Sequence, residues 1–185
     1  MKRGTLNHDL VIDQALKIVS ESGFDQLTYN GLARTLGVVP QSLYRYVDNI
    51  ADVKSGVIAA YINQLTDSLY QELVPFSGKE ALRQLADYFV AYTRTGIAVS
   101  DMISGLVSYR QTPDVLNAVG RLHTLAMQIM QSITSASEDV AANVDLFLNF
   151  VIGSVTLVTV QTVADHDAAR QKYLANVDRI LTLID

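Results

Sequence analysis

The sequence contains no cysteine and no tryptophan, and only three prolines occur in its 185 residues. Without thiols the chain has no means of forming a disulfide scaffold, a thiolate zinc site, an iron–sulfur cluster or a cysteine nucleophile. Basic residues are also few, 14 against 19 acidic ones, so the formal net charge is −5. Because phosphate backbones attract basic proteins, this overall charge disfavours nucleic acid as a partner.

Hydrophobic residues make up 49% of the chain and charged residues 18%, which is typical of a globular protein of one or two domains. Lys2 and Arg3 are followed by no apolar run before Asp9, so we do not expect a secretory signal there. Residues 146–164 carry no charge and are long enough to span a bilayer, but they include six polar residues. We therefore expect a helix buried on most sides in a soluble, cytoplasmic protein without a membrane part.

Apolar residues recur at helical spacing without sustained alternation, which predicts an all-α fold of about nine helices. Asn7 and Thr28 are the expected N-caps of the first two helices, and Gly23 and Gly37 are their expected ends. The expected helices cover residues 8–22, 29–36, 40–47, 51–73, 79–99, 101–109, 114–134, 138–164 and 167–183.

The most informative segment is residues 27–47, where two short helices meet at a glycine turn. Its apolar positions lock the two helices together, a pattern typical of a helix-turn-helix that enters the major groove of DNA. Since Leu43 and Val47 are expected to be buried one turn apart, the other side of this helix faces outward, with Gln41, Ser42, Tyr44 and Arg45. These outward residues are rich in groups that pair with base edges or phosphates. A helical hairpin without a ligand is the alternative at this point.

Residues 8–58 resemble the tetracycline-repressor-like (TetR) family of bacterial transcriptional regulators. The resemblance is carried by the first helix ending at Gly23, by Leu27-Thr28, Leu32-Ala33 and Leu36-Gly37-Val38, and by residues 43–47 followed by Asn49. It implies an N-terminal three-helix DNA-binding domain at residues 1–49. It also implies a C-terminal effector-binding and dimerisation domain at residues 50–185.

The resemblance also implies which residues meet DNA. Thr28 and Tyr29 lie where family members hold a phosphate, and Tyr44 matches the family's phosphate-contacting tyrosine. Ile50 stands where the family commonly has a lysine, so Lys54 is expected to substitute, together with backbone amides at that helix start. The expected DNA-binding residues are Thr28, Tyr29, Asn30, Val39, Gln41, Ser42, Tyr44, Arg45, Tyr46 and Lys54.

Residues 61–185 hold eight basic and thirteen acidic residues, so a phosphate-seeking surface is not expected there. Aromatic and methionine residues on the middle helices suit the wall of a pocket for a small apolar effector, although each is also typical of ordinary core or surface. The expected effector-binding residues are Phe89, Met102, Tyr109, His123, Met127 and Asn149. The three histidines are far apart in the sequence, and we expect no metal or other cofactor.

The expected helix at 138–164 is apolar round most of its circumference, so one face packs on its own core and another needs a partner. The resemblance implies a two-fold interface of four helices, formed with the helix at 167–183. The alternative is a helix that is central in a monomer. The expected interface residues are Phe150, Gly153, Ser154, Leu157, Leu174, Val177 and Leu181.

The leading hypothesis is a homodimeric repressor that binds a palindromic DNA operator through recognition helices about 34–36 Å apart. A small effector would shift the population towards a state with a different separation. No phosphate loop, metal motif or nucleophile elbow is present, so an enzyme is not expected. A regulator-like dimer that does not bind DNA and an all-α enzyme with an unrecognised site are the alternatives.

Overall fold

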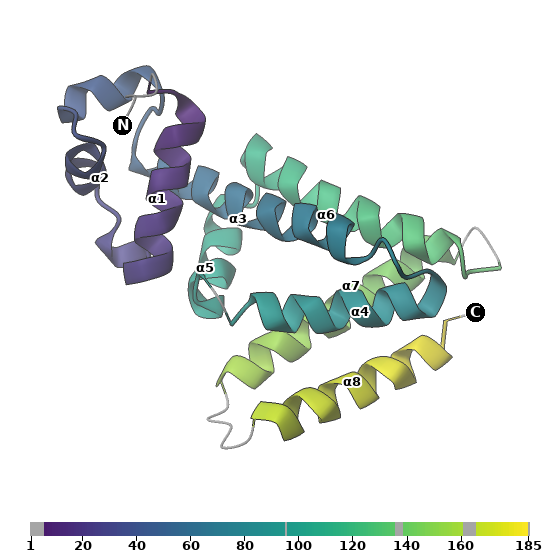
Figure 1. The fold of residues 1–185 in the computed structure, drawn as a ribbon. Coiled ribbons are helices and arrows are strands. Elements are labelled where there is room, and N and C mark those ends of the chain that lie inside the picture. Colours follow the sequence, from purple (N-terminus) through teal and green to yellow (C-terminus); the bar gives the residue numbers. More distant parts are fainter. Residues whose placement is uncertain (1–5, 95, 136–138, 161–165, 185) are drawn as a thin grey trace. The chain divides into compact units, whose positions relative to one another are not determined.

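The computed structural model describes residues 6–94, 96–135, 139–160 and 166–184. These residues form α-helices and short 3-10 helices, which confirms the predicted all-α class (Figure 1). The elements in chain order are α1 His8–Ser22, η1 Phe24–Gln26, α2 Tyr29–Leu36, η2 Pro40–Arg45, α3 Ile50–Glu72, α4 Gly78–Tyr92, α5 Val99–Tyr109, α6 Pro113–Gln131, α7 Val140–Val160 and α8 His166–Thr182, where η marks a 3-10 helix.

The chain divides into two compact units. Unit 1 consists of Met1–Asn63 and Thr95–Val119, and unit 2 consists of Gln64–Arg94 and Gly120–Asp185. Helices α3 and α6 therefore contribute residues to both units. The expected boundary between residues 49 and 50 separates a DNA-binding domain from an effector-binding and dimerisation domain. It is defined by function and not by packing, and it stays a prediction.

Local capping explains why α1 and α2 have the bounds that the sequence predicts. The Asn7 side chain accepts a hydrogen bond from the Leu10 amide at 2.8 Å, and Thr28 Oγ1 accepts one from the Gly31 amide at 3.1 Å. Gly37 adopts the left-handed conformation (φ 69°, ψ 30°) and ends α2. These contacts satisfy amides and carbonyls that helix ends otherwise leave unpaired.

Unit 1 is closed by the packing of α5 on the N-terminal helices. The Phe24 amide donates to the Asp101 carboxylate at 3.4 Å, across 77 residues of sequence. Gly105 lies so close to Ile58 that an added Cβ would overlap the Ile58 side chain, which is fully buried. A glycine at position 105 therefore allows α5 to approach α3 closely.

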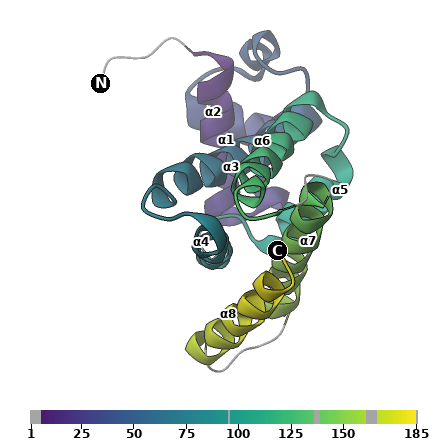
Figure 2. The same ribbon diagram turned by 90° about the vertical axis from the view of Figure 1, so that its right-hand side faces the viewer.

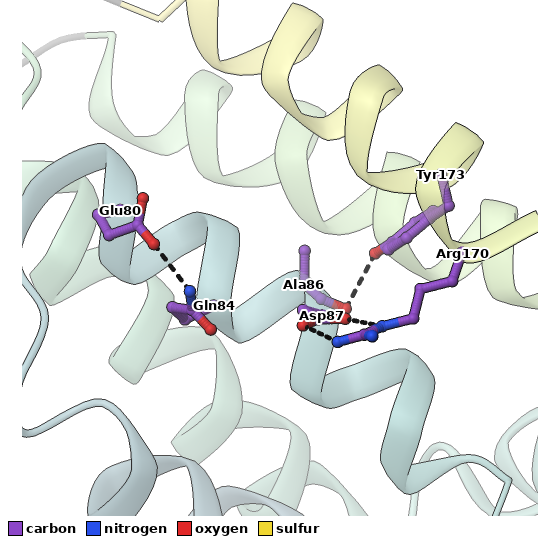
Figure 3. A network of polar contacts seen from close by, with 6 residues as sticks. All are labelled: Glu80, Gln84, Ala86, Asp87, Arg170 and Tyr173. Carbon is purple, nitrogen blue, oxygen red and sulfur yellow. Dashed lines mark hydrogen bonds and ion pairs between the residues drawn. The ribbon is translucent and has the colours of Figure 1, made fainter. Parts of the chain in front are cut away.

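In unit 2, α4, α7 and α8 pack against one another, and Figures 1 and 2 show α7 and α8 running antiparallel. Figure 3 shows the polar contacts between α4 and α8: Arg170 forms two hydrogen bonds with Asp87, at 2.7 and 2.5 Å. The Tyr173 hydroxyl donates to the Ala86 carbonyl at 3.1 Å. Burial, and then the nearby Asp87 carboxylate, raise the pKa of Tyr173 well above its ordinary value.

Three expected elements differ from the structure. The helix expected over 79–99 ends at Tyr92, and Gly96 then takes a positive φ of 101° that side chains disfavour. The segment expected as an α-helix at 40–47 is the 3-10 helix η2, which is six residues long including Pro40, and 3-10 helices occur in short pieces. The predicted ends of the helix at 138–164 fall partly outside the described residues, within which it is α7.

Helix α7 is also less buried than predicted. Its window Val140–Leu157 is, among the described helices, the one long and apolar enough to cross a membrane by length and composition, and 28% of that window is buried. The expectation of a helix buried on most sides therefore does not hold within one chain. The remaining exposed surface of α7 is available to another partner.

Candidate nucleic-acid interface

The N-terminal ends of α2 and α3 and the side of η2 border one hollow of about 450 Å³ in unit 1. It brings together five residues expected to bind DNA, namely Thr28, Tyr29, Asn30, Gln41 and Tyr44. Pro40, Asn49 and Ile50 complete its lining, and none of the eight lining residues carries a formal charge. The hollow therefore offers hydroxyl and amide groups to a ligand rather than a basic patch.

The 3-10 geometry of η2 explains which of its side chains reach the hollow. A 3-10 helix has three residues per turn, so Gln41 and Tyr44 lie one above the other on the same face. Both line the hollow, while Leu43 and Val47 are buried beneath, as the sequence predicts. Tyr44 is 62% exposed, so its ring projects from the protein surface.

Tyr29 at the start of α2 packs against Tyr44. The two ring centroids are 4.9 Å apart, with the ring planes tilted by 33°. The Tyr29 hydroxyl donates to the Val47 carbonyl at 3.3 Å. Burial raises the pKa of Tyr29, and the neighbouring Tyr44, Asp48 and Asp52 raise it further, so the hydroxyl keeps its proton at neutral pH.

The other expected DNA-binding residues lie outside the lining of this hollow. Val39 is 60% exposed, Arg45 is exposed, and Ser42 and Tyr46 are half-buried. The Lys54 amine lies 6.0 Å from the centre of the Phe24 ring, a distance typical of a cation–π contact. The DNA contact expected of Lys54 stays a prediction.

Asn49 caps the start of α3. The Asn49 side chain accepts hydrogen bonds from the amides of Ala51 (2.8 Å) and Asp52 (3.1 Å). These two amides are thus already bound within the protein, and a phosphate contact through other amides of this helix start stays a prediction. The Asp52 carboxylate in turn accepts from the Asp48 amide at 2.9 Å. Sequence reasoning missed the capping role of Asn49, although an asparagine just before an apolar helix is a typical N-cap signal.

The residues expected to bind an effector are divided between the two units. Met102 and Tyr109 belong to unit 1, and Phe89, His123, Met127 and Asn149 belong to unit 2. None of these four residues lines the hollow of about 310 Å³ beside Tyr70 or the hollow of about 210 Å³ beside Arg170, both in unit 2. His123 Nε2 lies 3.8 Å from an Asp145 carboxylate oxygen, and Asn149 is exposed. An effector site at these positions stays a prediction.

The residues expected at a dimer interface separate into two groups. On α7, Leu157 is 66% exposed, Gly153 is exposed with open space beside it, and Phe150 and Ser154 are half-buried. On α8, Leu174, Val177 and Leu181 are at most 5% exposed within one chain. These three leucine and valine side chains belong to the core of unit 2, which corrects their assignment to an interface. Among the described residues, no group of three or more His, Asp or Glu is placed to hold a metal ion.

Solved structures of bacterial regulators share this arrangement of helices. A TetR regulator from Streptomyces coelicolor superposes with a TM-score of 0.77 over 97% of each chain, at 14% sequence identity. This chain has the TetR fold. A TetR variant from Acinetobacter baumannii in complex with minocycline shares the TetR fold with a TM-score of 0.67, over 98% of this chain and 99% of that one, at 18% identity.

Sequence comparison adds a shorter match. An uncharacterised HTH-type transcriptional regulator of Mycobacterium tuberculosis is 33% identical over 64 residues. The match spans 35% of this chain and 29% of that protein's length. No model of a known protein family matches the chain. FadR of Bacillus subtilis, solved in complex with stearoyl-CoA, is a further structure with the TetR fold, with a TM-score of 0.64, 15% identity and coverage of 96% of this chain and 97% of that one.

Proposed function

We propose that this protein is a DNA-binding transcriptional regulator and not an enzyme. The observation that carries the proposal is the hollow beside η2, where Thr28, Asn30, Gln41 and Tyr44 present hydrogen-bonding groups from a helix-turn-helix. Glutamine can pair bidentately with adenine, and hydroxyls suit phosphate oxygens. The TetR fold and the regulator relatives support the same function.

The charge distribution decides how such a protein would bind. Residues 1–60 contain six basic and six acidic residues, so the DNA-reading half has no excess positive charge. Since non-specific affinity comes from basic residues that neutralise phosphates, that affinity should be modest. Specific binding would instead rest on two half-sites read by a dimer and on the neutral groups of the hollow.

A homodimer is proposed through the exposed face of α7. Leu146, Asn149, Gly153 and Leu157 are exposed and lie on one helical face, since their spacing follows the helical repeat. An added Cβ at Gly153 meets nothing within 4 Å, so a partner helix has room to approach the backbone there. An exposed apolar face of this kind typically marks a contact with another protein. The homodimer would place two copies of η2 on a palindromic operator.

We also propose that a small-molecule effector releases the protein from DNA, so that it acts as a repressor. Structures with the same fold were solved with minocycline and with stearoyl-CoA, which shows that those proteins hold small organic ligands. For this chain the proposed effector is a small apolar molecule, and the residues expected to bind it are those given above. Cytoplasmic localisation follows from the proposed role.

The test is selection of binding sites from a randomised duplex library, followed by fluorescence anisotropy with the selected duplex at low salt. A regulator enriches one palindromic sequence, and Gln41→Ala lowers the affinity for it. A matched control is Gln71→Ala, an exposed glutamine at the end of α3 in unit 2. Failure to enrich any sequence at low salt would refute DNA binding and favour a regulator-like dimer without DNA.

A further inference from the structure

We infer that Tyr29 is a positioning residue, which holds the ring of Tyr44 in place for DNA and does not itself bind a phosphate. The inference rests on the proposed function, and it assigns to Tyr29 a role other than the one implied by the family resemblance. It concerns two side chains from different elements, α2 and η2, that meet at the surface of the hollow.

The hydroxyl of Tyr29 already forms a hydrogen bond within the protein. A phenol has a single proton to donate, and Tyr29 donates it to the Val47 carbonyl at 3.3 Å. A phosphate oxygen is an acceptor only, so it would meet the lone pairs of this hydroxyl. The half-buried position of Tyr29 and the two carboxylates nearby, those of Asp48 and Asp52, disfavour an anion at this point further.

The Tyr44 ring, in contrast, needs support. It is 62% exposed and projects from a six-residue 3-10 helix, which is a short and weakly held element. An exposed aromatic side chain loses rotamer freedom when DNA fixes it, and that loss weakens binding. The Tyr29 ring, with its centroid 4.9 Å away, restricts Tyr44 before DNA arrives.

The hydrogen bond to Val47 adds to the support that the Tyr29 ring gives to Tyr44. Val47 is 2% exposed, and its amide donates to the Leu43 carbonyl of η2 at 3.0 Å. The Val47 carbonyl, which accepts from Tyr29, is thus held by the C-terminal end of η2. Tyr29 thus makes two contacts with η2 and the residues that follow it, through its ring at Tyr44 and through its hydroxyl at Val47. The pair fixes the side chain of Tyr44 relative to Gln41 and Thr28 in the same hollow.

A double-mutant cycle on the full chain tests this assignment with a duplex selected by wild-type protein. Tyr29→Leu should weaken binding about 2- to 10-fold, the range expected for the loss of an aromatic pair and of pre-ordering. Tyr29→Phe keeps the ring and should weaken binding less than about 2-fold. In a Tyr44→Ala background, Tyr29→Leu should have no further effect, because no ring remains to be positioned.

Two results would overturn the inference. One is a Tyr29→Leu effect of the same size with and without Tyr44, and the other is a Tyr29→Phe variant as impaired as Tyr29→Leu, as a direct phosphate bond through the hydroxyl requires. If Tyr29→Leu does not fold by circular dichroism, Tyr29→Phe decides, and a loss of affinity greater than about 2-fold would then overturn the inference. Tyr88→Leu, which removes a stacked tyrosine of unit 2, is the matched control. Wild-type protein that selects no duplex refutes the proposed function itself, whereas additive effects in a protein that binds refute only the role of Tyr29.

Discussion

Replacing Ile50 by lysine should strengthen DNA binding and make it more dependent on salt. Ile50 is the first residue of α3 and lines the hollow together with Thr28, Asn30 and Gln41, which no charged residue lines. A lysine there would reach the same space with a positive charge. Each phosphate that a cation neutralises releases counterions. The added lysine therefore makes the logarithm of the affinity fall more steeply with the logarithm of salt concentration.

The size of the effect follows from one added contact per protomer. Each contact adds about 0.9 to the salt slope, so a dimer gains about 1.8, and the variant should lose about 12-fold more affinity than wild type between 50 and 200 mM salt. The Asp48 and Asp52 carboxylates flank this position and compete for the lysine, so the measured gain should lie at or below that value. A cation in the first helical turn also costs about 0.3–1 kcal/mol of folding stability through the helix dipole.

The assay is fluorescence anisotropy over a series of salt concentrations with a selected duplex. Ile50→Met is the matched control, since it keeps a long apolar side chain without adding charge. A salt slope of Ile50→Lys equal to that of Ile50→Met, in a folded protein, would show that position 50 does not face a phosphate. That result would refute the placement of DNA against this hollow.

Further predictions concern the side chain of Lys54, the proposed dimer interface and the buried Tyr173. Lys54→Ala should reduce the salt slope by about 0.9 per protomer if Lys54 contacts a phosphate, and an unchanged slope would leave it a packing partner of the Phe24 ring. Leu157→Glu should convert a dimer to a monomer in sedimentation, whereas the control Leu116→Glu, 57% exposed on α6, should not; a Leu157→Glu dimer would argue against the α7 interface. Tyr173→Phe should lower the free energy of unfolding by about 1 kcal/mol at pH 7, because one hydrogen bond is lost. Above about pH 10 the unfolded wild type releases its Tyr173 proton first, since the pKa is raised in the folded state, so wild-type stability should fall with pH more steeply than that of the Phe variant in denaturant titrations.

The bounds of α1 and α2 could be predicted from the sequence because their signals are local. Asn7, Thr28 and Gly37 act within four residues of the helix ends that they set. The same locality explains why the hollow holds five of the expected DNA-binding residues: they lie within a short stretch of chain whose buried positions are evident from apolar spacing. The contact between Tyr29 and Tyr44 was not predictable, since it depends on the angle at which α2 meets η2.

Spacing alone was a poorer guide in the C-terminal part. Leu174, Val177 and Leu181 repeat at helical intervals, but that pattern does not distinguish a helix face covered by its own chain from one covered by a partner. The structure resolves this ambiguity, because α4 and α7 cover that face of α8. Residues expected around an effector come from distant helices, and their assembly depends on tertiary packing that no local pattern encodes.

The hydrogen bond between Phe24 and Asp101 has a consequence for synthesis of the protein in a cell. A ribosome adds about 5–20 residues per second, so the 77 residues between these partners take about 4–15 s to appear. During that interval α1, α2 and η2 exist without α5, and the close contact of Gly105 with Ile58 has not yet formed. Unit 1 therefore cannot close before α5 has been synthesised, and a nascent chain stalled before α5 should be more sensitive to proteases than the finished unit.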